Sequence, residues 1–356
     1  MSIRPRFAVL AFVALALLHL PAGPRWIATA PAEEPPEVAG KPFPVDRTQK
    51  LIEEGAVWTV EGRIRIPKGV EISLFRNCIV RAKGSGPAVI EVEGGLDAIG
   101  VLERETIFEN VTVEPRAKFE RIHMDMVIFR GGGGIRTPAD APADGYVLIE
   151  NIDFVKGAVF DVHFQKGSVE LSSMCADGNT AIRSSSAEGS KGNKVRVFVR
   201  GCHQEPRHRC SPHGGRVGLV GGLVVDGGDD ITVQLSRIGG RLAAVRNWGQ
   251  KLIFDGNKIN SDRLELSHAE PGMFQKVQCA KLDVYSGKVS ASAPAKKGVK
   301  DTFTMDRCWF KGVTDPKKVF EEVILDGADE PEKNGVRVQL PKINERPLEL
   351  AGEIDR

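Results

Sequence analysis

A short β-rich segment with an Asn, Asp or Gly at its hinge recurs between residues 64 and 310. The clearest copies are residues 74–80, 107–113 and 148–154, and weaker copies are residues 197–204, 252–259 and 303–310. A coil of this size buries its apolar side only when a neighbouring coil covers it. The repeat therefore predicts a β-solenoid of roughly seven to ten coils in one elongated domain. The repeat predicts the fold but not the function, because solenoids carry many unrelated functional sites.

The middle of the chain carries the clearest strand pattern. Short strands are expected at residues 147–154, 158–164, 168–174 and 180–185, separated by Gly- or Asn-bearing turns. Such spacing favours a β-helix, and a β-sandwich is the alternative. Helices are expected only near residues 49–54 and 315–322, and residues 336–340 with 348–350 are expected to form a loose C-terminal cover.

Residues 57–74 alternate apolar and polar side chains, with turn signals at Gly62 and at Pro67-Lys68-Gly69. This stretch resembles the opening coil of right-handed parallel β-helix proteins, the pectate-lyase-like superfamily. The resemblance implies an all-β right-handed parallel β-helix with a helical cap within residues 41–55. It also implies an inward ladder of side-chain amides formed by Asn77, Asn110 and Asn151, which would occupy one position of the repeat.

The N-terminus has the form of a secretory signal peptide, with Arg4 and Arg6 before the apolar run 7–20 and small residues up to Ala32. We expect cleavage after Ala32 and a secreted or periplasmic protein without a transmembrane span. An uncleaved membrane anchor is the alternative, although the run is shorter than the ~20 residues that cross a bilayer. The expected organisation is a signal peptide (1–32), a linker (33–48), a β-helix domain (49–325) and a C-terminal cover or tail (326–356).

The charge balance argues against nucleic acid as a partner. The whole chain has 49 basic and 47 acidic residues, and removal of residues 1–32 takes away three arginines and no acidic residue. The mature chain is therefore close to neutral, with both signs interspersed. A nucleic-acid-binding protein carries a basic footprint that this chain lacks.

Residues 202–213 contain His203, His208 and His213 together with Cys202 and Cys210. In an exported protein, the simplest interpretation is a disulfide between Cys202 and Cys210. A zinc-like metal bound by the three histidines and a thiolate is the alternative. The remaining cysteines at positions 78, 175, 279 and 308 lie in apolar strand contexts and are expected in the core.

Asp226, Asp229 and Asp230 form the best candidate for acid–base chemistry or calcium binding. The Gly-Asp-Asp sequence resembles one motif of polygalacturonase-type glycoside hydrolases, but the other motifs of that family are missing. Arg241 and His268 complete this candidate catalytic set. No cofactor is expected, and calcium is the alternative.

Other candidates depend on the register of the coils. By resemblance to pectate lyases, a calcium cluster and a catalytic Arg would come from Asp153, Asp161, Asp177, Arg183, Arg237 and Arg241. Alternation also predicts that Asp161 and His163 point outward together. Aromatic platforms for sugars are scarce, and only Trp248 has the sequence context of an exposed loop aromatic.

Two functions remain open from the sequence. The first is a non-catalytic, exported β-helix that binds a polysaccharide or an envelope protein, or serves a structural role. The second is a polysaccharide lyase or glycoside hydrolase that acts on an acidic polysaccharide.

Overall fold

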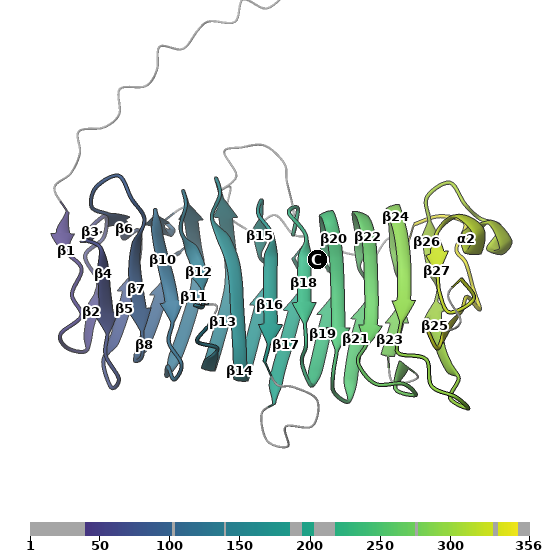
Figure 1. Ribbon diagram of the computed structural model, residues 1–356. Helices are drawn as coiled ribbons and strands as arrows, with labels where there is room; N and C mark the ends of the chain where they lie inside the picture. The colour runs from purple at the N-terminus through teal and green to yellow at the C-terminus, as the bar shows by residue number, and fades with distance from the viewer. Residues whose placement is uncertain are drawn as a thin grey trace, which may run out of the picture. The chain divides into compact units, whose positions relative to one another are not determined.

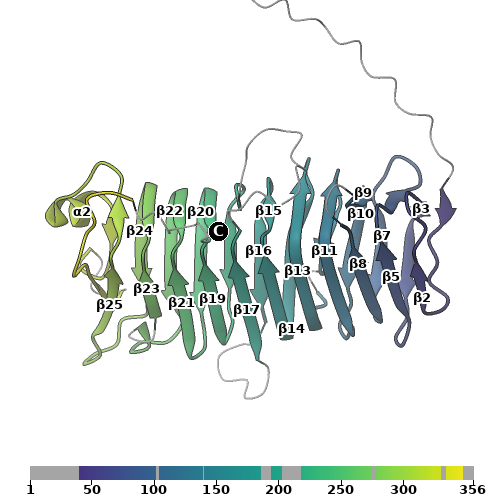
Figure 2. The ribbon, with the colours of Figure 1, turned by 180° about the vertical axis from the view of Figure 1, so that it is seen from behind.

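The chain forms a parallel β-helix. The computed structural model describes residues 40–101, 104–138, 140–185, 194–202, 218–274, 277–329 and 334–347. The described strands lie side by side along one axis from β1 to β28 (Figure 1), and the view from behind shows the same stack (Figure 2). Successive coils contribute neighbouring strands that run parallel, for example β17 beside β19 and β19 beside β21. Parallel ladders confirm the β-helix and exclude the hairpin-based sandwich.

The parallel ladders form three faces, which we number 1 to 3. Each coil passes through face 2, then face 3 and then face 1. Face 1 includes β1 (Lys41–Pro42), β3 (Val57–Val60), β6 (Ile79–Ala82), β9 (Thr106–Glu109), β15 (Cys175–Ala176) and β26 (Trp309–Phe310). Face 2 includes β4 (Arg63–Ile66), β7 (Ala88–Val92), β10 (Val111–Pro115), β12 (Gly134–Arg136), β16 (Thr180–Ser184), β18 (Leu223–Asp226) and β27 (Ile324–Leu325). Face 3 includes β2 (Gln49–Leu51), β5 (Glu71–Phe75), β8 (Gly95–Ile99), β17 (Val195–Arg200), β19 (Asp230–Gln234), β21 (Lys251–Asp255), β23 (Val277–Ala280), β25 (Asp301–Asp306) and β28 (Val336–Gln339).

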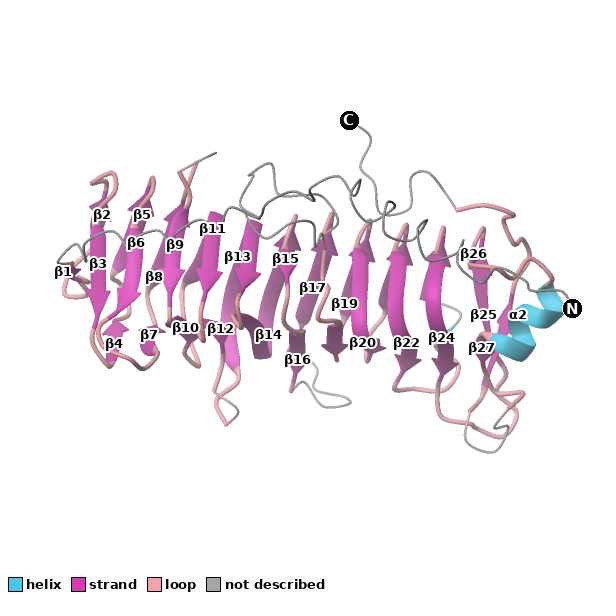
Figure 3. Cartoon of the chain, turned by 90° about the horizontal axis from the view of Figure 1, so that it is seen from above, coloured by secondary structure: helices cyan, strands magenta, loops and turns pink. Residues whose placement is uncertain are grey.

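Six longer strands bend around a corner and serve two faces each. Strands β11 (Arg121–Arg130) and β13 (Ala143–Val155) pass from face 3 to face 1, and β14 (Val159–Ser172) passes from face 2 to face 3. Strands β20 (Arg237–Asn247), β22 (Lys258–His268) and β24 (Asp283–Ser292) pass from face 1 to face 2. The cartoon seen from above shows these strands beside one another, with helix α2 (Pro316–Glu322) at the C-terminal end of the stack (Figure 3).

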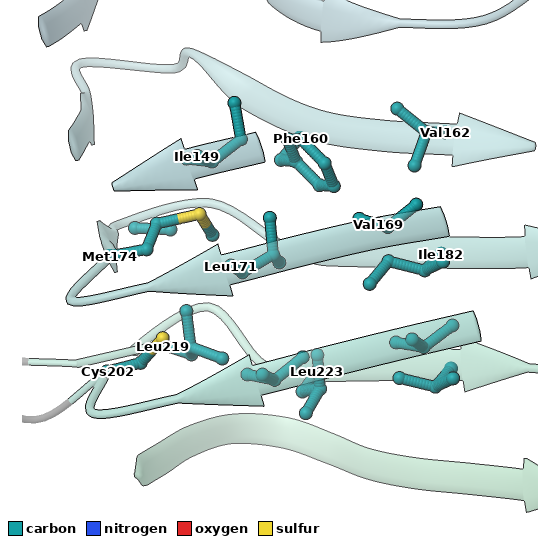
Figure 4. Close-up of a cluster of buried hydrophobic side chains, with 14 of the residues drawn as sticks. Ile149, Phe160, Val162, Val169, Leu171, Met174, Ile182, Cys202, Leu219 and Leu223 are labelled. Atoms are coloured by element: carbon teal, nitrogen blue, oxygen red, sulfur yellow. The ribbon is translucent and has the colours of Figure 1, made fainter. Parts of the chain in front are cut away.

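Apolar side chains from all three faces meet inside the helix. Ile149, Phe160, Leu171 and Leu223 are fully buried, and Figure 4 shows how side chains from successive coils lie above one another. Along one inward row, the rings of Phe108 and Phe129 stack at 4.8 Å and those of Phe129 and Phe154 at 5.0 Å. Alternation along each strand places every second side chain in this core, which explains why the repeat needs neighbours.

The expected Asn ladder is wrong in its geometry. Asn77 and Asn151 lie at the corner between faces 3 and 1, whereas Asn110 lies between faces 1 and 2. None of the three is buried. All three have positive φ, between 50° and 55°, and Asn tolerates this left-handed conformation better than most residues.

A buried amide does occur at the 3–1 corner, from another residue. The Asn257 side chain is fully buried, its Oδ1 accepts from the Ser236 backbone N–H at 3.0 Å, and its Nδ2 donates to the Val233 carbonyl at 2.9 Å. These contacts satisfy backbone groups of the preceding coil.

The two ends of the domain differ in part from the prediction. Residues 49–54 do not form a helical cap; the short strands β1 and β2 extend the faces instead. Helix α2 confirms the expectation for residues 315–322, with Asp315 as its N-cap. Residues 336–339 form β28, which pairs with β25 as a regular strand rather than a loose cover. Residues 348–350 lie outside the described part.

The cysteines at 78, 175, 279 and 308 are buried, which confirms their assignment to the core. The predicted signal peptide falls outside the described residues. Among the helices that are described, none is both long and apolar enough to cross a bilayer.

Candidate functional site

The predicted acidic triplet is divided among different parts of the coil. Asp226 points outward on face 2 as the last residue of β18. Asp229 lies at the corner, where its Oδ2 accepts from the Val195 backbone N–H at 2.9 Å. Asp230 points outward on face 3, with its Oδ2 3.9 Å from Nε of Arg196. The structure therefore does not bring the three carboxylates together.

Arg241 and His268, the two other residues of the predicted catalytic set, lie in other parts of the coil. Arg241 is exposed near the corner where β20 passes from face 1 to face 2. His268 is 3% exposed at the end of β22. Its Nδ1 accepts from the Glu270 backbone N–H at 3.0 Å, so Nε2 carries the proton that is donated to the Gly249 carbonyl, also at 3.0 Å. Both ring nitrogens of His268 are thus engaged by the backbone.

Face 2 carries a different constellation near the middle of the stack. His163, Arg183, Asp226 and Arg246 occupy one outward row on β14, β16, β18 and β20. Neighbouring coils in such a row are separated by ~4.8 Å, which is within reach of side-chain contacts. We define the central cluster as this row together with its neighbours Asp161 and Trp248.

Ion pairs cross the coils within the central cluster. The Asp161 carboxylate accepts a hydrogen bond from the Arg183 guanidinium. Nη1 of Arg246 lies 3.8 Å from Oδ1 of Asp226, which is an ion-pair distance but too long for a hydrogen bond. All four side chains of these pairs are between 42% and 54% exposed, so water screens each pair and the net stabilisation is small.

Trp248 follows directly after β20 and is held at the corner. Its backbone N–H donates to the Gly228 carbonyl at 3.2 Å. The Arg246 guanidinium lies over the indole, 5.7 Å from the ring centroid, in a cation–π contact. The sequence context predicted an exposed aromatic, and the structure places this ring half-buried beside Arg246 of the Arg246–Asp226 pair.

His163 is held in its neutral form. Burial and the positive charge of Arg183 lower its pKa, and Asp161 and Asp226 oppose that shift. The His163 backbone N–H donates to Oγ1 of Thr137 at 2.6 Å, which fixes the strand beneath the ring. The expected outward pair of Asp161 and His163 is therefore present, and it is one part of a larger cluster.

Two polar atoms of the central cluster are buried without a hydrogen-bond partner. They are Oδ1 of Asp226, an acceptor, and Nε1 of Trp248, a donor. Buried polar atoms are nearly always paired, so unpaired ones call for a ligand or an ordered water. A hydroxyl group can serve both, because it donates and accepts.

The segment rich in His and Cys cannot be placed in the site. His203, His208, His213 and Cys210 lie outside the described residues, so the metal site and the Cys202–Cys210 disulfide stay predictions. Cys202 is fully buried, and burial raises the pKa of its thiol to about 11. Within the described ranges, no group of three or more His, Cys, Asp or Glu side chains could hold a metal ion.

The fold defines this chain as a parallel β-helix protein with a mixed-charge, Trp-bearing cluster on one face. Searches with protein-family models, curated proteins and solved structures find no match to the chain. The parallel β-helix is confirmed, whereas membership of the pectate-lyase-like superfamily stays a prediction.

Sequence reasoning missed Arg246 and the alignment of Arg183 with Asp226. The register places His163 and Arg246, which are 83 positions apart in the sequence, in one row. The available signal was the alternation of polar residues within each strand, but the offset between coils depends on loops of unequal length.

Proposed function

We propose that the protein is an exported β-helix that binds a hydroxyl-rich polysaccharide on face 2 without cleaving it. The observation that carries the proposal is the central cluster, in which the Trp248 ring packs against Arg246 of one Arg–Asp pair and a second Arg–Asp pair lies on the preceding coils. A flat aromatic ring with polar groups around it matches a sugar ring, which has apolar C–H faces and a polar rim. Export is supported by the signal-peptide pattern of residues 1–32.

The unpaired atoms suggest how a sugar hydroxyl would be held. Arg246 contacts both the indole of Trp248 and Oδ1 of Asp226. Its side chain is 54% exposed, so moving it disrupts little packing. A hydroxyl group that displaced this guanidinium would donate to Asp226 Oδ1 and accept from Trp248 Nε1, pairing two atoms that otherwise have no partner.

The separation of the carboxylates supports binding without hydrolysis. Asp161 and Asp226 lie two strand spacings apart, about 9.6 Å along the axis, and also in different rows. Glycoside hydrolases hold their two carboxyl groups about 5–5.5 Å apart when retaining and about 6.5–9.5 Å apart when inverting. The backbone positions of this pair are therefore spaced wider than the carboxyl separation of a retaining enzyme and at the upper end of the inverting range.

A lyase is the second candidate, and one observation favours it. The neutral His163 imidazole beside Arg183 has the chemistry required to remove a proton next to a uronate carboxylate that Arg183 would neutralise. Such a reaction breaks the C–O bond to the leaving sugar and leaves an unsaturated product.

One set of assays tests both candidates. The chain from Glu33 is titrated with neutral and acidic polysaccharides, with and without calcium, while tryptophan fluorescence reports binding and absorbance and reducing ends report cleavage. We expect binding without products, and about tenfold weaker binding for Trp248→Ala. Trp58→Ala, on the opening coil, is the matched control and retains binding.

The outcomes separate the candidates. Equal loss of binding in both Trp variants, or no binding by the folded chain, would refute the proposed function. Cleavage that disappears in His163→Gln would establish the lyase instead.

A further inference from the structure

Two free cysteines contact each other inside the C-terminal part of the stack. The Cys279 and Cys308 thiols share a hydrogen bond, and neither residue is part of a disulfide. Cys279 is 4% exposed and Cys308 is fully buried. The two residues are 29 positions apart in the sequence, so the fold brings their side chains together.

The two thiols belong to successive coils. Cys279 lies on β23, where its direct partner across the ladder is Met305 of β25. Cys308 follows β25 at the corner between faces 3 and 1, and the next residue, Trp309, donates its backbone N–H to the Leu282 carbonyl of the preceding coil at 2.8 Å. A disulfide joins Cα atoms about 4.4–6.8 Å apart, which suits residues on neighbouring coils that are ~4.8 Å apart.

The ladder that joins these two coils is short. We define the terminal coil as β25 and β26. Cys279 and Ala280 are the residues of β23 that pair with β25, whereas the whole of β23 pairs with β21 on its other side. Repeats near the end of a solenoid open more readily than central ones, because fewer neighbours hold them. A covalent bond at this point would therefore reinforce a part of the stack that has little strand pairing.

The pair reacts slowly while it stays buried. The hydrogen bond with Cys308, together with burial, raises the pKa of the Cys279 thiol well above its usual range. The thiolate is the nucleophile in disulfide exchange, so a buried, protonated thiol is a poor reactant. Reaction therefore takes place when the terminal coil opens or before it has folded. Closure of the coil then returns the two sulfur atoms to contact.

We propose that Cys279 and Cys308 form a disulfide that ties the terminal coil to the preceding coil when a small-molecule disulfide such as oxidised glutathione is present. One thiolate attacks the S–S bond of the oxidant, which gives a mixed disulfide and releases one glutathione thiol. The second thiolate attacks the protein sulfur of the mixed disulfide, forms the new S–S bond and releases the second glutathione. Two electrons and two protons thus pass from the protein to the oxidant. The cross-link depends neither on ligand binding at face 2 nor on export of the chain.

The first test needs no substitution. The whole chain is equilibrated with oxidised or reduced glutathione, alkylated and digested with trypsin, which leaves the two cysteines on residues 277–281 and 308–311. We expect these two peptides to be linked in the oxidised sample and separate in the reduced one, as measured by mass spectrometry. The bond closes a loop of about 30 residues in the unfolded chain, so thermal unfolding of the oxidised sample is expected at least about 5 °C higher.

Matched alanine variants assign the effect to this pair. Cys279→Ala and Cys308→Ala each remove one partner, whereas Cys78→Ala removes a buried thiol that donates to the Phe75 carbonyl at 3.1 Å. All three variants lose packing, so the quantity compared is the unfolding temperature of the oxidised sample minus that of the reduced sample. We expect this difference to be at least about 5 °C smaller than in the wild type for the first two variants, and unchanged for Cys78→Ala. Circular dichroism establishes that each variant is folded.

Three results would overturn the proposal: folded, oxidised protein without the linked peptides, a link from either cysteine to a different cysteine, or a wild-type temperature difference in Cys279→Ala. Trp248→Ala serves as a further control and is expected to form the link as the wild type does. Failure of the face 2 proposal and failure of this one are therefore separate outcomes.

Discussion

Asp153 provides a direct test of the packing on face 1. Its side chain is 4% exposed, and its Oδ1 is buried without a hydrogen-bond partner. Burial, followed by the negative charges of Asp177 and Glu105, raises the pKa of this carboxyl from 3.8 to about 7. In the folded protein the group is therefore protonated well above the pH at which an unfolded chain loses that proton.

The sign of the effect on stability follows from proton binding. Below about pH 4 both states are protonated, so Asp153 adds no pH-dependent cost. Between about pH 4 and 7 the folded state binds more protons than the unfolded state, so the free energy of unfolding falls as the pH rises. With the shift from 3.8 to about 7, the total loss is about 4 kcal/mol, and it is complete above about pH 7.

Asp153→Asn removes this dependence because the amide has nearly the same shape and no charge to titrate. The measurement is urea unfolding of both proteins from pH 4 to pH 8. The difference in unfolding free energy, variant minus wild type, is expected to rise by about 4 kcal/mol across that range. Asp262→Asn, at an exposed position, is the control for the loss of a carboxyl group without burial.

A difference for Asp153→Asn that stays flat between pH 4 and 8 would refute the reasoning. A difference that falls with pH would show that Asp153 is ionised and paired in the folded protein. A titration of the Asp153 carboxyl carbon by NMR gives the same answer without unfolding.

Two further predictions concern the interior of the coils. Phe129→Ala removes the middle ring of the stacked Phe108, Phe129 and Phe154 and is expected to lower the free energy of unfolding by about 3–5 kcal/mol, measured by urea unfolding. Phe320→Ala, at a 38% exposed position, is the control, and equal losses would contradict the assigned core. Asn257→Leu leaves two backbone partners of Asn257 unpaired and is expected to cost about 2–4 kcal/mol in the same assay; a loss below about 1 kcal/mol would show that the amide contacts contribute little.

The fold could be predicted because its signal is local. Many strands alternate apolar and polar residues, and many turns carry Gly, Asn or another residue that adopts positive φ. The strands around residues 147–164 were therefore expected nearly where they occur, as β13 and the first part of β14. The caps were harder, since a few residues at an open edge can extend a sheet or form a helix at similar cost.

The site could be predicted only in fragments. Asp161 with His163, and Trp248, were singled out from their own surroundings, but their association with Arg183, Asp226 and Arg246 depends on register. The Asn residues show the same limit. Asn77 and Asn110 look equivalent in the sequence, yet they turn different corners of the coil. Local sequence patterns indicate backbone conformation, but they do not indicate which corner of the coil a residue occupies.

Each coil contributes one residue to every outward row, and this arrangement affects how such a protein can change during evolution. Duplication of one whole coil inserts a new member into the rows of all three faces and keeps the inward alternation of every other coil. Insertion of a single residue within a strand exchanges inside and outside for the rest of that strand. Surfaces on this scaffold are therefore free to lengthen by whole units, so duplication of the β20–β21 coil would add a second Arg246 to face 2 and a second Arg237 to face 1 at the same time.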